Sequence, residues 1–163
     1  MSQFALYVKA IHYLSEYQVP VTATRVFADL QFATNTAAPI RLACVVDSGA
    51  PLSVIPFSLW HDRQLQWTSL GAQLSVQGRP VQDALTWQGI YCDLGCTRVE
   101  LCDIAAGLLA GPYLVIGKFA HNPHPQPEIE NLLILGVNFL TDNFLEIKLD
   151  GKPGSLVATL LDQ

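Results

Sequence analysis

The most constraining feature of the chain is an uncharged apolar segment that ends in a carboxylate. Residues 42–46, Leu-Ala-Cys-Val-Val, have the composition of a buried strand, and Asp47-Ser48-Gly49-Ala50 follows directly. A carboxylate next to apolar residues is costly to bury unless it is solvated or used. The segment therefore predicts a strand that ends at a tight turn, with Asp47 as a candidate functional residue.

Short apolar segments between turn residues make up most of the remaining sequence. Residues 26–32 alternate between apolar and polar, a turn follows over 34–39, and a strand over 40–46, expected to be buried on both faces, leads into Asp47. Further strands are expected over 74–76, 87–94, 97–102, 113–119, 132–135 and 144–149, the last ending in a turn at Asp150-Gly151. Residues 57–62 are expected to be helical or irregular, and residues 137–143 to form a short helix. Many short strands and few helices indicate an all-β domain.

The charge composition limits the classes of partner. Only 14% of the residues are charged, against about 25% in an average domain, and 50% are apolar. This balance predicts that another subunit or a bound peptide covers part of the surface. The net charge of -5 and the nine Lys and Arg residues argue against a nucleic-acid partner, because phosphate binding requires clustered cations.

The apolar residues do not indicate a membrane protein. No stretch approaches the roughly 18 uninterrupted apolar residues of a membrane span, and residues 1–9 lack the basic start and the cleavage site of a signal peptide. A cytoplasmic location is therefore expected. Four cysteines are too few for a disulfide scaffold at this length.

A second motif follows the first after about ninety residues. Residues 132–136, Leu-Leu-Ile-Leu-Gly, form an apolar segment that ends in glycine, just before the expected short helix. Together the two motifs resemble the paired signatures of retropepsin-type aspartic proteases, including the bacterial single-domain relatives of the retroviral enzymes. The resemblance covers residues 26–149 and implies a closed acid-protease β-barrel with one short helix after the Ile-Leu-Gly strand.

The resemblance also assigns roles to individual residues. It implies a catalytic carboxylate at Asp47, and the physical properties of its neighbours suit an active-site turn: Ser48 can bond nearby backbone and Gly49 lets backbone approach closely. Ala50 completes this turn, and Leu135 with Gly136 forms the second motif beneath the site. The resemblance divides the chain into an N-terminal segment (1–20), a retropepsin-like domain (21–151) and a C-terminal strand or tail (152–163). The apolar spacing of residues 4–14 leaves both a helix and a strand open for the first segment.

Peptide hydrolysis by carboxylates requires two of them, which share one proton and hold a water molecule. Within the chain, only Asp93-Leu94-Gly95 has another Asp-x-Gly form, and it lacks the central hydroxyl and the apolar strand that follows. The chain is also about half the length of a two-lobed enzyme. The expected protein is therefore a homodimer, in which Asp47 and its symmetry mate hydrolyse a peptide or protein substrate without a metal or an organic cofactor.

The sequence departs from the retroviral pattern at two places. The expected flap, the hairpin that closes over the substrate, has Gln77, Gly78 and Arg79 at its turn, with one glycine where retroviral flaps have several. Pro51 and Val137 occupy the positions of an acidic residue and an arginine that pair in viral members. Both charges are absent together, so no charge is left unpaired, but the viral mode of dimerisation does not carry over.

Alternative functions remain open for the same residues. A retropepsin-like fold without turnover would serve as a peptide-binding or scaffolding module. A serine nucleophile at Ser48 is disfavoured because the chain has no Gly-x-Ser-x-Gly. A zinc site would need ligands with unusual spacing, so buried thiols and a solvated loop are the preferred interpretation of Cys92, Cys96, Cys102, His121 and His124. Trp87, after the expected flap, is a candidate for the wall of a substrate pocket.

Overall fold

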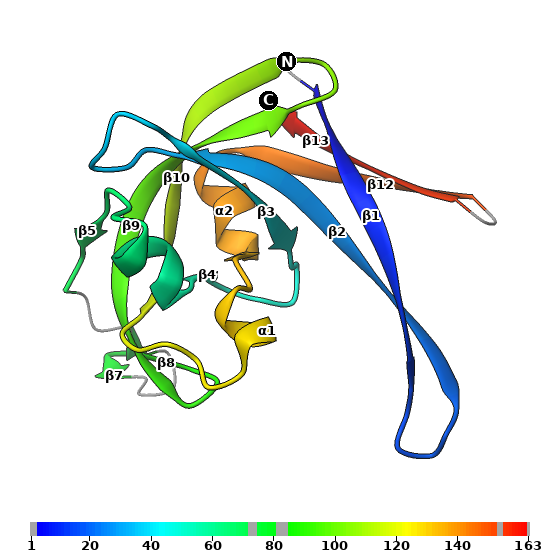
Figure 1. The fold of residues 1–163 in the computed structure, drawn as a ribbon, viewed down its shortest axis with the longest axis horizontal. Coiled ribbons are helices and arrows are strands. Elements are labelled where there is room, and N and C mark those ends of the chain that lie inside the picture. Colours follow the sequence, from blue (N-terminus) through cyan, green and yellow to red (C-terminus); the bar gives the residue numbers. More distant parts are fainter. Residues whose placement is uncertain (1–2, 72–74, 81–84, 153–154, 163) are drawn as a thin grey trace.

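The computed structural model describes residues 3–71, 75–80, 85–152 and 155–162, most of which lie in β-strands (Figure 1). The strands are β1 (Gln3–Leu14), β2 (Pro20–Phe32), β3 (Ile40–Val46), β4 (Ser53–Ile55), β5 (Thr68–Ser69), β6 (Ser75–Val76), β7 (Arg79–Pro80), β8 (Thr86–Trp87), β9 (Ile90–Asp103), β10 (Leu108–Ala120), β11 (Ile134–Leu135), β12 (Leu145–Lys152) and β13 (Ser155–Asp162). The helical segments are a π-helical turn, η1 (Ser58–Asp62), and the short helices α1 (Pro127–Glu130) and α2 (Val137–Asp142). The all-β class is confirmed, and α2 occupies the place of the helix that the sequence predicts.

Most strands belong to one sheet that brings distant parts of the sequence together. Its order is β12-β13-β1-β2-β3-β11-β4-β10-β9-β5, and β9 also pairs with β2. The short strand β8 pairs with β9, whereas β6 and β7 form a separate two-stranded sheet. Late in the chain, β11 enters the sheet between β3 and β4, parallel to β3 and antiparallel to β4. This order places the second sequence motif directly beside the first.

The core lies on the sheet face to which the alternating apolar residues point. Ala28, Leu30 and Phe32 of β2 are all buried, in agreement with the alternation that predicts this strand. Phe119 of β10 is fully buried, and its ring stacks on Trp67 with the centroids 4.6 Å apart. Burying one such side chain contributes about 2 kcal/mol. The core therefore holds β2 and β10 in fixed positions around the two motifs.

Gly95 explains why one long strand replaces two predicted ones. The sequence predicts strands over 87–94 and 97–102 with a break at Gly95, but β9 continues from Ile90 to Asp103. A Cβ atom at Gly95 would lie 2.7 Å from the rings of both Trp67 and Phe119. Gly95 is therefore a strand position where the two rings leave no space for a side chain.

Both ends of the described chain form strands that pair with one another. β1 pairs with β13 over residues 3–6 and with β2 over residues 7–14, so the N-terminal segment is a strand. β12 continues through Asp150 and Gly151, which pair with Val157 and Leu156, and the turn predicted there is wrong.

Two further details differ from the expectations. The bounds of β3 agree with the sequence, but only Cys44 and Val45 are fully buried, so burial on both faces is wrong for most of this strand. β11 comprises only Ile134 and Leu135, although the carbonyl oxygen of Leu133 still accepts a hydrogen bond from the Val45 N–H at 2.9 Å.

Two hairpins extend from the body of the molecule in different directions (Figure 1). We call them the β1–β2 arm (residues 9–25) and the β12–β13 arm (residues 149–152 and 155–157). Large apolar side chains are exposed on both arms: Leu14, Tyr17, Val19, Leu149, Leu156 and Val157. The arms thus carry apolar surface beyond the core. Among the described residues, none of the helices has the length and apolar character needed to span a membrane.

Candidate active site around Asp47

Asp47 lies at the end of β3, where the backbone of the second motif fixes its position. The Asp47 N–H donates to the carbonyl oxygen of Leu135 at 2.9 Å. The Gly49 N–H donates to Asp47 Oδ1 at 2.8 Å, and the Ala50 N–H donates to the Asp47 carbonyl oxygen at 3.2 Å. The turn therefore holds one carboxylate oxygen, while the side chain stays partly accessible.

Gly136 locks the second motif against the Asp47 turn. The Val137 N–H donates to the Ala50 carbonyl oxygen at 2.8 Å, and the Gly136 N–H donates to Ser53 Oγ at 3.1 Å. A Cβ atom at Gly136 would lie 2.5 Å from the Leu52 carbonyl carbon and 2.7 Å from the Ala50 oxygen. Only glycine permits this close approach of two backbone segments. The structure thus brings together the two motifs that the sequence singles out.

Asn138 supports this arrangement and does not stand out in the sequence. Its side-chain oxygen accepts a hydrogen bond from the Ser53 N–H at 3.0 Å, and its Nδ2 donates to the Ile116 carbonyl oxygen at 2.7 Å. Asn138 therefore links α2 to β4 and β10 beneath the site. The only feature of the sequence that could have pointed to Asn138 is its amide side chain at the start of the expected short helix, one residue after Val137.

A cleft of about 390 Å³ opens beside Asp47. Its lining includes the Asp47 turn, the apolar side chains of Val54 and Ile134, and Trp87 and Lys118 on the far side. Trp87 precedes a tight turn in which Gln88 and Gly89 have φ values of 52° and 77°. Trp87 therefore occupies the cleft wall suggested by the sequence, whereas Lys118 is a site residue that sequence reasoning missed.

A groove of about 430 Å³ lies on the other side of Asp47, between the two arms. Thr24 and Val26 of β2 line one side, Leu149 and Leu156 line the other, and Val46, Asp47 and Ser48 form its base. Leu149 is 54% exposed and Leu156 is 36% exposed. Asp47 therefore lies between two openings that both combine polar and apolar residues, and Arg25 adds a positive charge to the groove.

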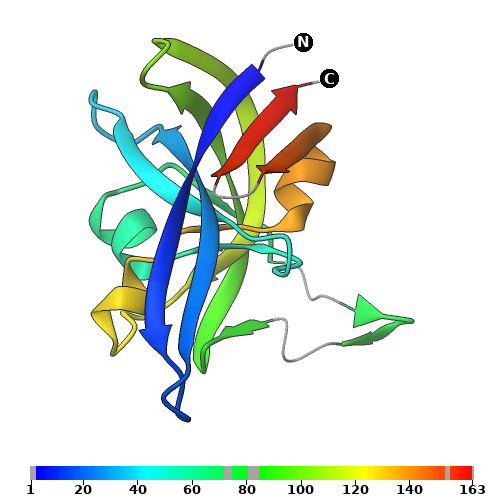
Figure 2. The same ribbon diagram turned by 90° about the vertical axis from the view of Figure 1, so that its right-hand side faces the viewer.

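The expected flap residues form a hairpin that stands away from the main body (Figure 2). Gln77 and Gly78 have φ values of 52° and 75°, which is the two-residue turn geometry favoured in hairpins. Arg79 follows in β7, and Val76 pairs with it. In the described part of the chain, the Asp47 cleft is lined by Trp87 and Gln88 and not by this hairpin. The segments that connect it to the body include residues 81–84, which lie outside the described ranges.

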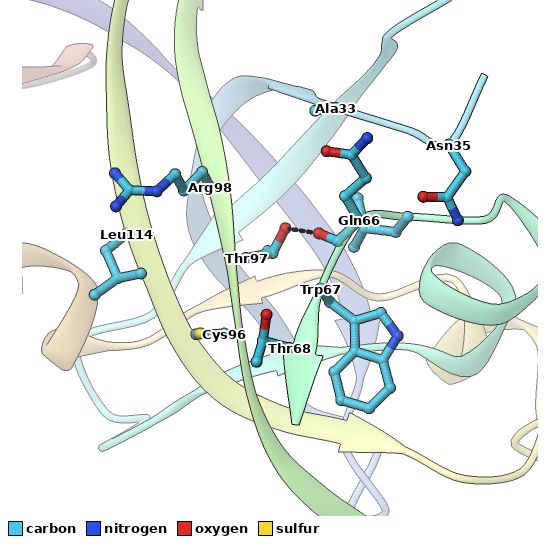
Figure 3. A pocket seen from close by; sticks show the side chains of 10 residues that line it. Ala33, Asn35, Gln66, Trp67, Thr68, Cys96, Thr97, Arg98 and Leu114 are labelled. Carbon is cyan, nitrogen blue, oxygen red and sulfur yellow. Dashed lines mark hydrogen bonds between the residues drawn. The ribbon is translucent and has the colours of Figure 1, made fainter. Parts of the chain in front are cut away.

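A larger cavity of about 610 Å³ lies beside β5, β9 and β10 (Figure 3). Trp67, Thr68, Cys96 and Arg98 are part of its lining, and the Thr97 hydroxyl donates to the Gln66 carbonyl oxygen. Its lining, as far as the described residues show it, includes no carboxylate and none of the residues of the two motifs. A reaction catalysed by carboxylates would therefore take place in the smaller cleft at Asp47.

The cysteines and histidines do not form a metal centre in the described ranges, where no three potential ligands cluster. Cys92 and Cys102 are buried, and burial raises the pKa of the Cys92 thiol to about 11. Burial also raises the pKa of the Cys44 thiol, which donates to the Ala28 carbonyl oxygen. These thiols therefore remain protonated at neutral pH.

Both departures from the viral pattern lie next to the site. Pro51 is exposed and lines the cleft, and Val137 is 39% exposed at the start of α2. No charged pair bridges the two motifs at these positions, and backbone hydrogen bonds connect them instead. No protein-family model matches the sequence, and no curated protein matches it either.

Proposed function

We propose that the protein is an aspartic endopeptidase of retropepsin type that acts as a homodimer. The observation that carries this proposal is the position of Asp47, at the end of β3 and beside β11, which comes from the second motif. Asp47 is also part of the lining of a cleft of about 390 Å³, which is the binding site proposed for the peptide. The pairing of β9 with both β2 and β10 supports an acid-protease barrel as the framework of this site.

The proposed reaction is the addition of water to a peptide carbonyl. One Asp47 carboxylate removes a proton from the water, and its protonated symmetry mate donates a proton to the carbonyl oxygen. The diol intermediate then returns one hydroxyl proton to the ionised Asp47, while the other Asp47 gives the amine the proton taken from water as the C–N bond breaks. In each subunit, the Gly49 N–H holds Oδ1, which fixes the orientation of the carboxylate.

The surface on both sides of Asp47 supports a two-subunit site. Ser48 is exposed next to the groove between the arms, and Leu149 and Leu156 present apolar surface there. A second subunit that covers this apolar surface would bring its own Asp47 close to the first. In such a dimer, the two clefts lined by Trp87 join across the two-fold axis into one channel for an extended peptide.

Replacing the catalytic carboxylate tests the proposal. Asp47→Asn is expected to lower kcat/KM for peptide hydrolysis about 10³-fold, because the amide can neither share the proton nor act as base. The matched control is Asp93→Asn, since Asp93 accepts a hydrogen bond from Ser69 on the surface and has no proposed role. Cleavage of unfolded protein by each purified variant would be followed by mass spectrometry. An Asp47→Asn protein as active as the wild type would refute the proposal.

A peptide-binding or scaffolding module remains the second candidate, and one observation favours it. The terminal strands β1 and β13 pair with one another within one chain, so this part of the sheet forms without a second subunit. A monomer would have only one Asp47 carboxylate in its site, so it would bind peptides without cleaving them. Sedimentation at increasing protein concentration distinguishes the candidates, because the enzyme requires a dimer.

A further inference from the structure

Lys118 places a positive charge in the same cleft as Asp47. It lies on β10, and its Nζ donates to the Thr86 carbonyl oxygen at 2.9 Å. Among the described residues, no carboxylate lies within ion-pair distance of Lys118. An ammonium group has three donors, and two of them remain available for a ligand.

Strand pairing fixes the direction in which Lys118 points. Ile134 of β11 pairs with Val54 of β4, and Val54 pairs with Lys118 of β10. Residues paired in this way lie on the same face of a sheet, and all three line the cleft. The next residue, Phe119, points to the opposite face and is fully buried. The cleft floor therefore changes from apolar to cationic with increasing distance from Asp47.

We propose that Lys118 determines specificity by binding an acidic side chain of the peptide. This inference rests on the proposed function only in that the occupant of the cleft is a peptide. A carboxylate there would take the free donors of Lys118, while the neighbouring apolar part of the peptide would contact Val54 and Trp87. The net charge of -5 opposes acidic ligands overall, so recognition depends on this local cation.

The strand order limits where the acidic residue lies in the peptide. Three strand spacings separate β3, which carries Asp47, from β10, which carries Lys118. At about 4.8 Å for each spacing, the distance across the sheet is about 14 Å, which an extended peptide spans in about four residues. The acidic side chain is therefore expected within about four residues of the bond that Asp47 cleaves.

Binding to an inactive protein tests the inference separately from catalysis. The probes are two pools of synthetic decapeptides whose sequences are random except at one fixed position. This position is Asp in the first pool and Asn in the second. Asp47→Asn protein is expected to retain the Asp pool about threefold more strongly than the Asn pool, a typical effect for a partly exposed ion pair. Moving the fixed residue along the peptide locates the subsite.

Variants of Lys118 provide the controls. Lys118→Gln should abolish the preference, Lys118→Arg should retain it, and Lys118→Glu should reverse it toward a pool with Lys at the fixed position. A purely structural role for Lys118 does not predict this reversal. The matched control is Lys148→Gln, because Lys148 is an exposed lysine on β12 outside the cleft.

The outcomes separate this inference from the proposed function. Equal retention of both pools, or a preference that Lys118→Gln leaves unchanged, would overturn the role of Lys118 even if the wild type cleaves peptides. A preference for acidic peptides that depends on Lys118, in a protein whose wild type shows no cleavage, would support the inference and refute the proposed protease. If the wild type cleaves peptides with a preference for acidic residues and Lys118→Gln cleaves them without it, both the inference and the proposed protease would be supported.

Discussion

Tyr113 ties the last strand of the chain to the core through a single hydroxyl group. Its ring is buried, and the hydroxyl donates to Asp162 Oδ2 on β13 at 2.8 Å. Burial, and then the hydrogen bond to the Asp162 carboxylate, raise the pKa of Tyr113 from 10.0 to about 12. The folded state therefore favours the neutral phenol more strongly than the unfolded state does.

This raised pKa predicts a loss of stability at high pH. The contribution of Tyr113 is complete below pH 10 and is lost as the pH rises from 10 toward 12, because only the unfolded chain then readily releases the proton. Tyr113→Phe is expected to be less stable than the wild type at pH 8, and the difference should shrink above pH 10. Urea unfolding at several pH values measures this. Tyr17→Phe, at an exposed ring, is the control, and a difference independent of pH would contradict the prediction.

Single residues show how far the sequence predicts the candidate site. Asp47 and Gly136 were identifiable because each ends an apolar segment, and the structure brings the two together. Lys118 and Asn138 were not, because a lysine inside a strand and an amide in a short helix are ordinary in sequence. Their positions depend on which strands become neighbours, and contacts between distant segments determine that order.

At the scale of the elements, Gly136 is the residue on which the packing of β11 against the Asp47 turn depends. Gly136→Ala places a Cβ atom 2.5 Å from the Leu52 backbone, where no flexible side chain can yield. We expect this variant to lose about 3 kcal/mol or more of unfolding free energy. Thermal unfolding followed by circular dichroism measures the change.

Gly151 provides the matched control in another strand. A Cβ atom there would meet only the end of the Leu156 side chain at 3.7 Å, which is an ordinary contact. Gly151→Ala is expected to be neutral or slightly stabilising, because alanine restricts the unfolded chain. If both glycine variants unfolded at the same temperature as the wild type, the close packing of the two motifs would be refuted.

The same comparison of glycines explains which elements the sequence predicts well. Gly78 lies in a hairpin turn, as expected, because glycine adopts its positive φ at no steric cost. Gly95 and Gly151 lie inside strands, where the sequence predicts a break or a turn. A glycine selected for space and a glycine selected for a turn look identical in sequence, so the strand class was predictable, but the boundaries of the strands that contain Gly95 and Gly151 were not.

At the scale of the whole molecule, the two arms are the largest departure from what the sequence predicts. The apolar spacing of residues 4–14 left both a helix and a strand open, and the glycine at 151 concealed the length of β12. The arms enclose the groove at Asp47 and present Leu149 and Leu156 to it. Their exposed apolar surface agrees with the low charge content of the chain and is the expected contact for a second subunit.

A charge in this groove tests whether the arms hold the proposed dimer together. Leu149→Glu is expected to weaken dimerisation at least tenfold, because a carboxylate would replace apolar surface and lose its water at the contact. Peptide hydrolysis should fall in proportion to the dimer fraction, while the fold of the monomer should not change because Leu149 is exposed.

The control is Val157→Glu. Val157 lies on the opposite face of the same arm, since Val157 pairs with Asp150 and Leu149 pairs with Ala158. Sedimentation velocity and hydrolysis over a range of concentrations measure both effects. Equal dimerisation of the two variants would place the subunit contact elsewhere on the molecule.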